Sequence, residues 1–330
     1  MGGLTSPRDA VLRLGTATLY RMRAEGVDAS LPPLFLVPSM INRAYVLDLR
    51  EGASLAAAVA SASPRRAVYL LDWGIPEDED RYTNWDEVIA KLARFARAVR
   101  RHAGARKIAV LGYCMGGTLS SIYAALNPEE VCALIDLAGP IDFSHAGLLG
   151  ELVDAKHFDA SAIVSAGNLA ATQMQSGFLA LRPTGSIAKW VGFADKAHDE
   201  LSREAFFSLE EWASDNIPFP GAAYETYIGD LYQKNALVKG EHRVLGERVD
   251  LGRIKCPVMV VVAERDAICP KEAATALLAH VGSKTTKVMS IPGGHVGAVV
   301  GSRAQKVLYP GISEWLAEVA GPRASAVATA

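Results

Sequence analysis

A cysteine flanked by glycines is the residue of this sequence best suited to nucleophilic chemistry. Gly112, Tyr113, Cys114, Met115 and Gly116 follow an apolar stretch and precede a helix-like run. The pattern G-x-C-x-G places a thiol at a sharp strand-to-helix turn, where glycines allow close backbone approach. The start of a helix offers a positive dipole end and a free N–H, which favour a thiolate and a developing oxyanion. The alternative is a buried cysteine in an ordinary turn.

Two more residues follow apolar runs at positions where they would complete a catalytic set. Asp266 follows PVMVVVAE, and His295 follows TKVMSIPG. The order nucleophile, acid, histidine is that of an α/β-hydrolase triad. Catalytic groups of such sheets gather beyond the carboxyl ends of the strands, where all three residues are expected. We therefore predict a triad of Cys114, Asp266 and His295.

Other residues are alternatives for these roles. Asp142, in AGPIDFSH, follows another predicted strand and is a second candidate for the acid. Asp266 also suits an N-cap for a helix that begins near Pro270, and His295 suits a loop held by its glycines. Cys269 has no elbow around it. The remaining histidines and cysteines are expected at the surface or in packing: His102, His145, His157, His198, His242, His280, Cys132 and Cys256.

The oxyanion of an acyl transfer needs two backbone donors. One is the N–H of Met115, directly after the nucleophile. The second is expected from the loop VPSMIN after the first buried strand, with Met40 and Ile41 as candidates. Pro38 has no N–H to donate.

Short β-rich runs alternate with helical stretches along most of the chain. Residues 85–104 form an amphipathic helix pattern that ends at Gly104 with basic residues in its last turn. The alternation predicts a mostly parallel sheet with helices on both faces, the α/β-hydrolase fold. The predicted buried strands are LFLV at 34–37, AVYLLDW at 67–73, KIAVLG at 107–112, VCALIDLA at 131–138 and PVMVVVAE at 257–264; TKVMSIPG at 286–293 is a further apolar run.

The alternation breaks between about His145 and Arg253, in a stretch that is rich in aromatic residues and long for a connection. We predict a helical cap at 145–253, inserted between core segments at 1–144 and 254–318, with a disordered tail at 319–330. A cap suits the exclusion of water from a reactive acyl group. Its candidate wall residues, which ordinary cap packing also explains, are Trp190, Phe206, Phe207, Trp212 and Tyr227.

The composition excludes several classes of function. The 330 residues are 50% hydrophobic and 21% charged, as in soluble globular proteins, and a net charge of −2 argues against nucleic acid as a partner. No apolar run reaches the ~20 residues that cross a bilayer. The four cysteines form no CxxC pair, so we expect no metal site, no cofactor and no disulfide, in a reducing cytoplasm.

Long composite motifs resemble those of the polyhydroxyalkanoate synthases. They run in family order from about Leu19 to Leu316, and the chain resembles the short, partner-dependent synthases of class III, with class IV as the alternative. One departure is Ala267, where the family has histidine after the aspartate; we expect it to tune the site. The matching motifs are MINRAYVLDL, VYLLDWGIPEDEDR, LGYCMGGTLSSIYAALNPE, GPIDF, FLALRP, LYQKNALVKG, CPVMVVVAERDAICP and PGGHVGAVVGSRAQKVLYPGISEWL.

The resemblance implies an acyltransferase that polymerises (R)-3-hydroxyacyl-CoA, with 3-hydroxybutyryl-CoA as the expected monomer, and releases CoA. It makes Cys114 the acylated nucleophile, His295 its base, and Asp266 the acid that acts on the incoming hydroxyl or on His295. It also implies a second synthase subunit, a homodimer, and association with the polyester granule surface in the cytoplasm.

Cysteine suits this chemistry because moving an acyl group from CoA to a thiol exchanges one thioester for another. Two alternatives remain open. One is a cysteine hydrolase of the dienelactone hydrolase or thioesterase kind, some of which share the elbow. The other is a non-enzymatic granule-surface or scaffold protein on an inactive hydrolase fold.

Overall fold

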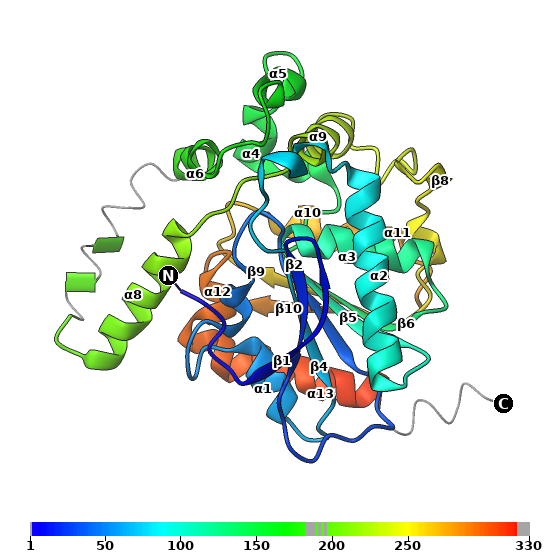
Figure 1. Cartoon of the computed structure of the whole chain (residues 1–330), viewed down its shortest axis with the longest axis vertical. Coiled ribbons are helices and arrows are strands. Elements are labelled where there is room, and N and C mark those ends of the chain that lie inside the picture. The colour runs from blue at the N-terminus through cyan, green and yellow to red at the C-terminus, as the bar shows by residue number, and fades with distance from the viewer. Residues whose placement is uncertain (1, 182–188, 191–192, 195–196, 322–330) are drawn as a thin grey trace.

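An eight-stranded sheet forms the centre of the molecule. The computed structural model describes residues 2–321 apart from 182–188, 191–192 and 195–196. The strand order is β1-β2-β4-β3-β5-β6-β9-β10. The pairs β1–β2 and β2–β4 are antiparallel, and every pair from β4 to β10 is parallel (Figure 1). The strands are β1 (Arg8–Leu14), β2 (Ala17–Met22), β3 (Leu34–Val37), β4 (Val68–Asp72), β5 (Ile108–Tyr113), β6 (Val131–Leu137), β9 (Val258–Ala263) and β10 (Thr286–Ile291).

Helices cover both faces of this sheet, so it has two hydrophobic cores. Helices α2 (Trp85–Ala103) and α3 (Met115–Leu126) contribute to one core, and α1 (Leu55–Ser61) and α13 (Tyr309–Val319) contribute to the other. Along β3, alternate residues enter opposite cores, as the period of a strand requires. The predicted α/β-hydrolase fold with a mostly parallel sheet is confirmed.

The predicted helix at 85–104 is α2. Asn84 caps its first turn by accepting a hydrogen bond from the Glu87 N–H, and the Glu87 carboxylate accepts one from the Asn84 N–H. Gly104 ends the helix in a left-handed conformation, with φ of 65°. All five predicted strands are present, and the further apolar run at 286–293 contains β10. The antiparallel strands β1 and β2, near the N-terminus, were not predicted.

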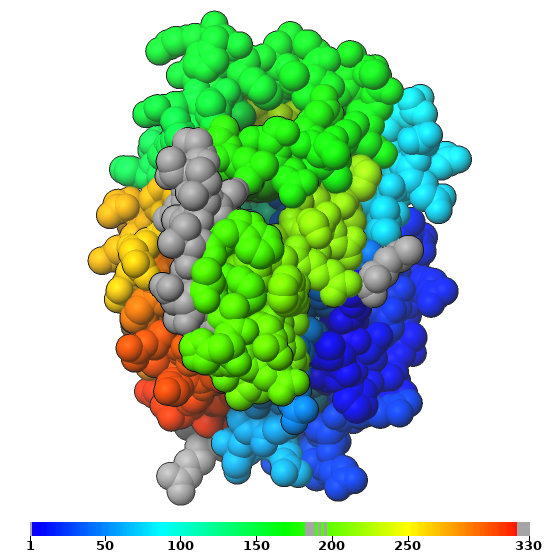
Figure 2. Space-filling model, turned by 90° about the vertical axis from the view of Figure 1, so that its left-hand side faces the viewer, coloured from blue at the N-terminus to red at the C-terminus, as the bar shows by residue number. Residues whose placement is uncertain are grey.

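Helices also fill the stretch between β6 and β9. No described residue between 145 and 253 joins the eight-stranded sheet. Figure 1 shows α4, α5, α6 and α9 together at one end of the molecule, and Figure 2 shows α8 along an outer face. The elements are α4 (Gly147–Leu152), α5 (Ala160–Val164), α6 (Ala171–Ala180), α8 (Glu200–Ser214), α9 (Gly221–Thr226), the π-helix η4 (Tyr227–Gln233), β7 (Arg243–Val244), β8 (Glu247–Arg248) and η5 (Leu251–Arg253).

The cap boundaries at 145 and 253 remain predictions. The predicted tail at 319–330 begins at the last residue of α13, Ala320 is buried, and residues 322–330 lie outside the described part. Within the described residues, no helix has the length and apolar character that crossing a bilayer requires. The short helices of the core are η1 (Ala44–Asp48), η2 (Asp78–Tyr82), η3 (Phe143–His145), α10 (Lys271–Thr275), α11 (Leu277–His280), α12 (Gly297–Val300) and η6 (Ala304–Leu308).

Strand β5 and helix α3 approach so closely that only glycine fits between them. A Cβ on Gly112 would overlap the carbonyl oxygen of Gly116, and a Cβ on Gly116 would overlap the carbonyl oxygen of Val37. These neighbours are backbone atoms, which cannot rotate away as a side chain can. The start of α3 is therefore wedged against the ends of β5 and β3.

We expect Gly116→Ala to lower the free energy of unfolding by about 3 kcal/mol, because the added methyl group has no space and overpacked sites cost energy of this order. Urea denaturation followed by circular dichroism measures the change. Gly177→Ala in α6 is the matched control, since a Cβ there meets no atom within 4 Å. Equal stability of the two variants would contradict the close packing.

Candidate active site

Cys114 lies at the junction of β5 and α3 in a strained backbone conformation. Its φ is 57° and its ψ is −130°, which is rare for a residue with a side chain. The Cys114 N–H donates to the Leu137 carbonyl at 2.9 Å, and the Gly117 N–H donates to the Cys114 carbonyl at 2.7 Å. These bonds hold the turn in place. The predicted elbow therefore has the strained backbone geometry of a nucleophile turn, and Cys114 is half-buried.

Asp266 and His295 are bonded directly to each other. His295 Nδ1 lies 2.7 Å from Asp266 Oδ2, and the two side chains are 7% and 0% exposed. The other carboxylate oxygen, Oδ1, accepts hydrogen bonds of 2.9 Å from the N–H groups of Ile268 and Cys269. Two fixed donors thus orient the carboxylate, and the carboxylate fixes the imidazole ring. The neighbouring Ala267 makes none of these contacts.

The pKa of the His295 ring depends on Cys114. Burial would lower the pKa of His295, but the nearby Cys114 sulfur and the Asp266 carboxylate raise it to about 10. The second ring nitrogen, Nε2, is buried and has no nitrogen or oxygen partner among the described residues, and a side-chain hydrogen bond with Cys114 contributes to the raised pKa of the ring. It remains available to the thiol. The structure therefore places the side chains of Cys114, His295 and Asp266 near one another, and their action as a catalytic triad stays a prediction.

Tyr113 packs against the imidazole ring of His295, a contact that was not predicted. Its ring stacks on that of His295 with centroids 5.2 Å apart and planes at 27°. Its hydroxyl donates to the His295 carbonyl at 3.4 Å. Tyr113 is 2% exposed, so the two stacked rings are buried together. Tyr113 is the first variable position of the G-x-C-x-G pattern, and that pattern does not predict the contact.

The three predicted oxyanion donors lie at the start of α3 and in the loop after β3. Met115 is the first residue of α3, where backbone N–H groups have no acceptor within their own helix. Met40 and Ile41 are buried in the loop after β3, and Ile41 lines the same cavity as Cys114 and Met115. The Ile41 N–H is directed at Ser39 Oγ, at a long 3.4 Å. Their roles as oxyanion donors stay predictions.

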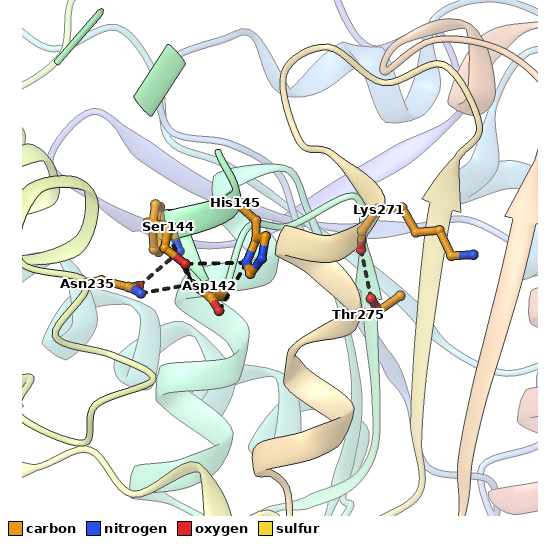
Figure 3. Close-up of polar contacts among 7 residues, drawn as sticks. Asp142, Ser144, His145, Asn235, Lys271 and Thr275 are labelled. Carbon is orange, nitrogen blue, oxygen red and sulfur yellow. Dashed lines mark hydrogen bonds and ion pairs between the residues drawn. The ribbon is translucent and has the colours of Figure 1, made fainter. Parts of the chain in front are cut away.

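The alternative acid, Asp142, belongs to a separate network (Figure 3). Its Oδ1 accepts hydrogen bonds from the Ser144 hydroxyl at 2.6 Å and the Asn235 amide at 2.8 Å. Its Oδ2 lies 3.2 Å from His145 Nδ1. The side-chain oxygen of Asn235, Oδ1, in turn accepts a bond from the Phe143 N–H. These contacts join the start of the insertion to its later part and do not involve His295.

The other three cysteines are poor nucleophiles. Burial raises the pKa of Cys132 to about 11 and that of Cys256 to about 12. Burial also raises the pKa of Cys269 well above its ordinary value. Among the described residues, no three His, Cys, Asp or Glu side chains gather as they would around a metal ion.

Two cavities of different chemistry meet at Cys114. The first, of about 360 Å³, is lined mainly by apolar side chains of the insertion, including Tyr227. The second, of about 270 Å³, is lined by His295, Trp212 and several polar side chains. We call them the apolar chamber and the polar chamber. Of the other candidate wall residues, Trp190 and Phe206 pack on each other with ring centroids 4.8 Å apart.

Comparisons with known proteins agree with this fold. Residues 32–302 match the family model described as alpha/beta hydrolase fold. A hydrolase from Pseudomonas aeruginosa PA01 has the same fold, with a TM-score of 0.57, 13% identity, and coverage of 94% of this chain and 98% of that one.

Two relatives identify a specific family within this fold. The poly(3-hydroxyalkanoate) polymerase subunit PhaC of Allochromatium vinosum is 33% identical over 95% of this chain and 89% of its own length. The protein of the same name from Synechocystis sp. is 32% identical over 95% of this chain and 85% of its own. The chain therefore belongs to the poly(3-hydroxyalkanoate) polymerase family of α/β-hydrolase-fold enzymes.

Proposed function

We propose that this enzyme polymerises (R)-3-hydroxyacyl-CoA into polyhydroxyalkanoate through an acyl group carried on Cys114. The observation that carries the proposal is the buried His295 ring, bonded to Asp266 on one side and close to the Cys114 sulfur on the other. Membership of the polymerase family supports the same reaction. The expected monomer is 3-hydroxybutyryl-CoA.

In the first step the Cys114 thiolate attacks the thioester carbonyl of the substrate. The carbonyl oxygen becomes an oxyanion, which we assign to the N–H groups of Met115 and of Met40 or Ile41. The carbon–sulfur bond to CoA breaks, and the leaving thiolate takes a proton from His295 Nε2. The product is an acyl-Cys114 thioester, close in energy to the thioester that entered.

In the second step the 3-hydroxyl of another acyl unit attacks the acyl-Cys114 thioester. His295 accepts the hydroxyl proton, an ester bond forms, and Cys114 leaves as a thiolate. A positioned base of this kind contributes about 10²–10⁴-fold to the rate. Asp266 keeps the ring in the required tautomer and stabilises its charge after proton transfer. No step requires a metal or a further cofactor.

We also propose two properties of the assembly and location of this enzyme. The relatives are named as polymerase subunits, which supports a partner subunit here and, as expected from the resemblance, a homodimer. A growing polyester is insoluble, so an enzyme that stays attached to it through Cys114 would lie at the surface of a polymer granule.

We expect Cys114→Ala to abolish CoA release from 3-hydroxybutyryl-CoA, because no acyl-enzyme forms without the sulfur. Free thiol is measured with a chromogenic disulfide, and the product is scored as polymer or as free hydroxy acid. Cys132→Ala is the control and keeps activity, since that thiol is held protonated on β6. An active Cys114→Ala enzyme contradicts the mechanism, and free acid without polymer points to a hydrolase.

The charge of His295 predicts a pH dependence. Because its pKa is raised to about 10, the ring holds its proton at neutral pH, where its positive charge favours the Cys114 thiolate. The positive charge on His295 is complete below the ordinary pKa of histidine. It is lost as the pH rises through about 10, and its effect on the Cys114 thiolate is lost with it.

We expect His295→Gln to slow the alkylation of Cys114 by iodoacetamide at pH 7 by about tenfold or more. Peptide mass spectrometry assigns the label to Cys114, and the rate is compared between pH 6 and pH 10. An unchanged rate at pH 7 would show that the ring does not activate the sulfur.

Tyr113 is proposed as a positioning residue. We expect Tyr113→Leu to lower kcat about tenfold with little change in KM, because the ring of His295 loses its stacking partner. Tyr113→Phe keeps the stack and is expected to restore most of kcat. If the phenylalanine variant is as slow as the leucine variant, the hydroxyl bond to the His295 carbonyl matters more than the stack.

A further inference from the structure

The apolar and polar chambers offer different environments to the two halves of a hydroxyacyl-CoA. Cys114, Phe178 and Ile268 line both, so both chambers open onto the reacting sulfur. The inference below rests on the proposed function, since it concerns the substrate of that site.

The polar chamber suits the CoA side of the thioester. Asn42 donates from its side-chain amide to Asn216 at 2.7 Å, and Lys189 pairs with Glu210 at 2.5 Å on its wall. His295, which we assign as the proton donor to the leaving thiolate, lines this chamber and not the other. Amide and charged groups match the amides of the pantetheine arm. The apolar chamber is left for the acyl group.

The apolar chamber is much larger than a 3-hydroxybutyryl group. Its volume is about 360 Å³. In another protein, an apolar cavity of roughly 150 Å³ holds one benzene molecule, which is close in size to a 3-hydroxybutyryl group. Such a group would therefore fill less than half of the chamber. An acyl group with a side chain several methylenes longer would fill it.

The lining favours a hydrocarbon tail over a second ester unit. Leu149, Leu152, Met174 and Ile228 are among its apolar wall residues. Polar residues are a minority of the wall: Gln173, whose side-chain oxygen accepts a bond from the Ala170 N–H at 3.1 Å, and Tyr224, Tyr227 and Tyr232. Each methylene buried against the apolar residues is stabilising, whereas every ester carbonyl of a second unit would need a hydrogen-bond donor.

We infer that the apolar chamber binds 3-hydroxyacyl groups of medium chain length, such as 3-hydroxydecanoyl, and that Gly177 on α6 sets the space for the side chain. Gly177 lines the chamber. A Cβ built on it meets no atom within 4 Å, so the wall is open there and a larger side chain would project into free space. A glycine inside a helix lowers helix stability relative to alanine, which is consistent with a role other than folding.

The experiment measures acylation of Cys114 in the full-length enzyme by intact-protein mass spectrometry. Single-turnover rates are compared for 3-hydroxydecanoyl-CoA and 3-hydroxybutyryl-CoA. The variants are Gly177→Leu, Gly177→Ala and the control Ser176→Leu, which adds leucine to the same helix at an exposed position that does not line the chamber. Cys114→Ala provides the blank, and thermal melting checks that each variant is folded.

We expect the wild type to accept both substrates, with the longer one at least as fast. Gly177→Leu should lower the rate ratio of longer to shorter substrate by about tenfold or more, since each displaced methylene in an apolar pocket has a large effect. Gly177→Ala should lower it less, and Ser176→Leu should leave it unchanged.

Acylation by the short substrate alone in the wild type overturns the inference and leaves the proposed function intact. If Gly177→Leu lowers the acylation rate equally for both substrates, the inference is also overturned. If neither substrate acylates Cys114, the proposed function fails as well.

Discussion

Contact between glycine backbones beneath Cys114 is the constraint on which the rest of the structure depends. Gly112 and Gly116 let β5, α3 and the end of β3 meet without an intervening side chain. On the opposite side, Gly117 and Gly139 approach each other over the buried Asp136 carboxyl group. With its neighbours fixed in this way, Cys114 has no relaxed conformation available and takes a positive φ. The strain places the sulfur where both chambers reach it.

The central part of the fold follows from patterns that are local in the sequence. Strands buried on both faces appear as continuous apolar runs, and α2 shows its period, its cap and its glycine stop within twenty or so residues. The antiparallel pair β1 and β2 has no such run: β1 (Arg8–Leu14) contains no fully buried residue, because it lies at the edge of the sheet. Its pairing depends on a tertiary partner, which a single sequence does not reveal.

The site, too, has parts that the sequence predicts and parts that depend on tertiary packing. Cys114, Asp266 and His295 follow strands whose carboxyl ends meet at one edge, so their chain order was sufficient to predict that they come together. The stacking of Tyr113 on His295 depends on how β5 and the loop after β10 pack, and no spacing rule encodes it. The two chambers are even harder to predict from the sequence. Their walls come from insertion helices that are only five to fifteen residues long and are positioned by contacts far apart in the chain.

The hydrogen bond between Asp142 and Asn235 joins residues 93 positions apart in the sequence. The long excursion of the chain that bears α4 to α9 thus leaves the sheet and comes back at nearly one point. Loop closure depends only weakly on length once the two ends are held together. Segments between these anchors can therefore lengthen, shorten or be exchanged with little strain on the sheet, so the shape of the chambers is free to diverge while the nucleophile turn stays the same.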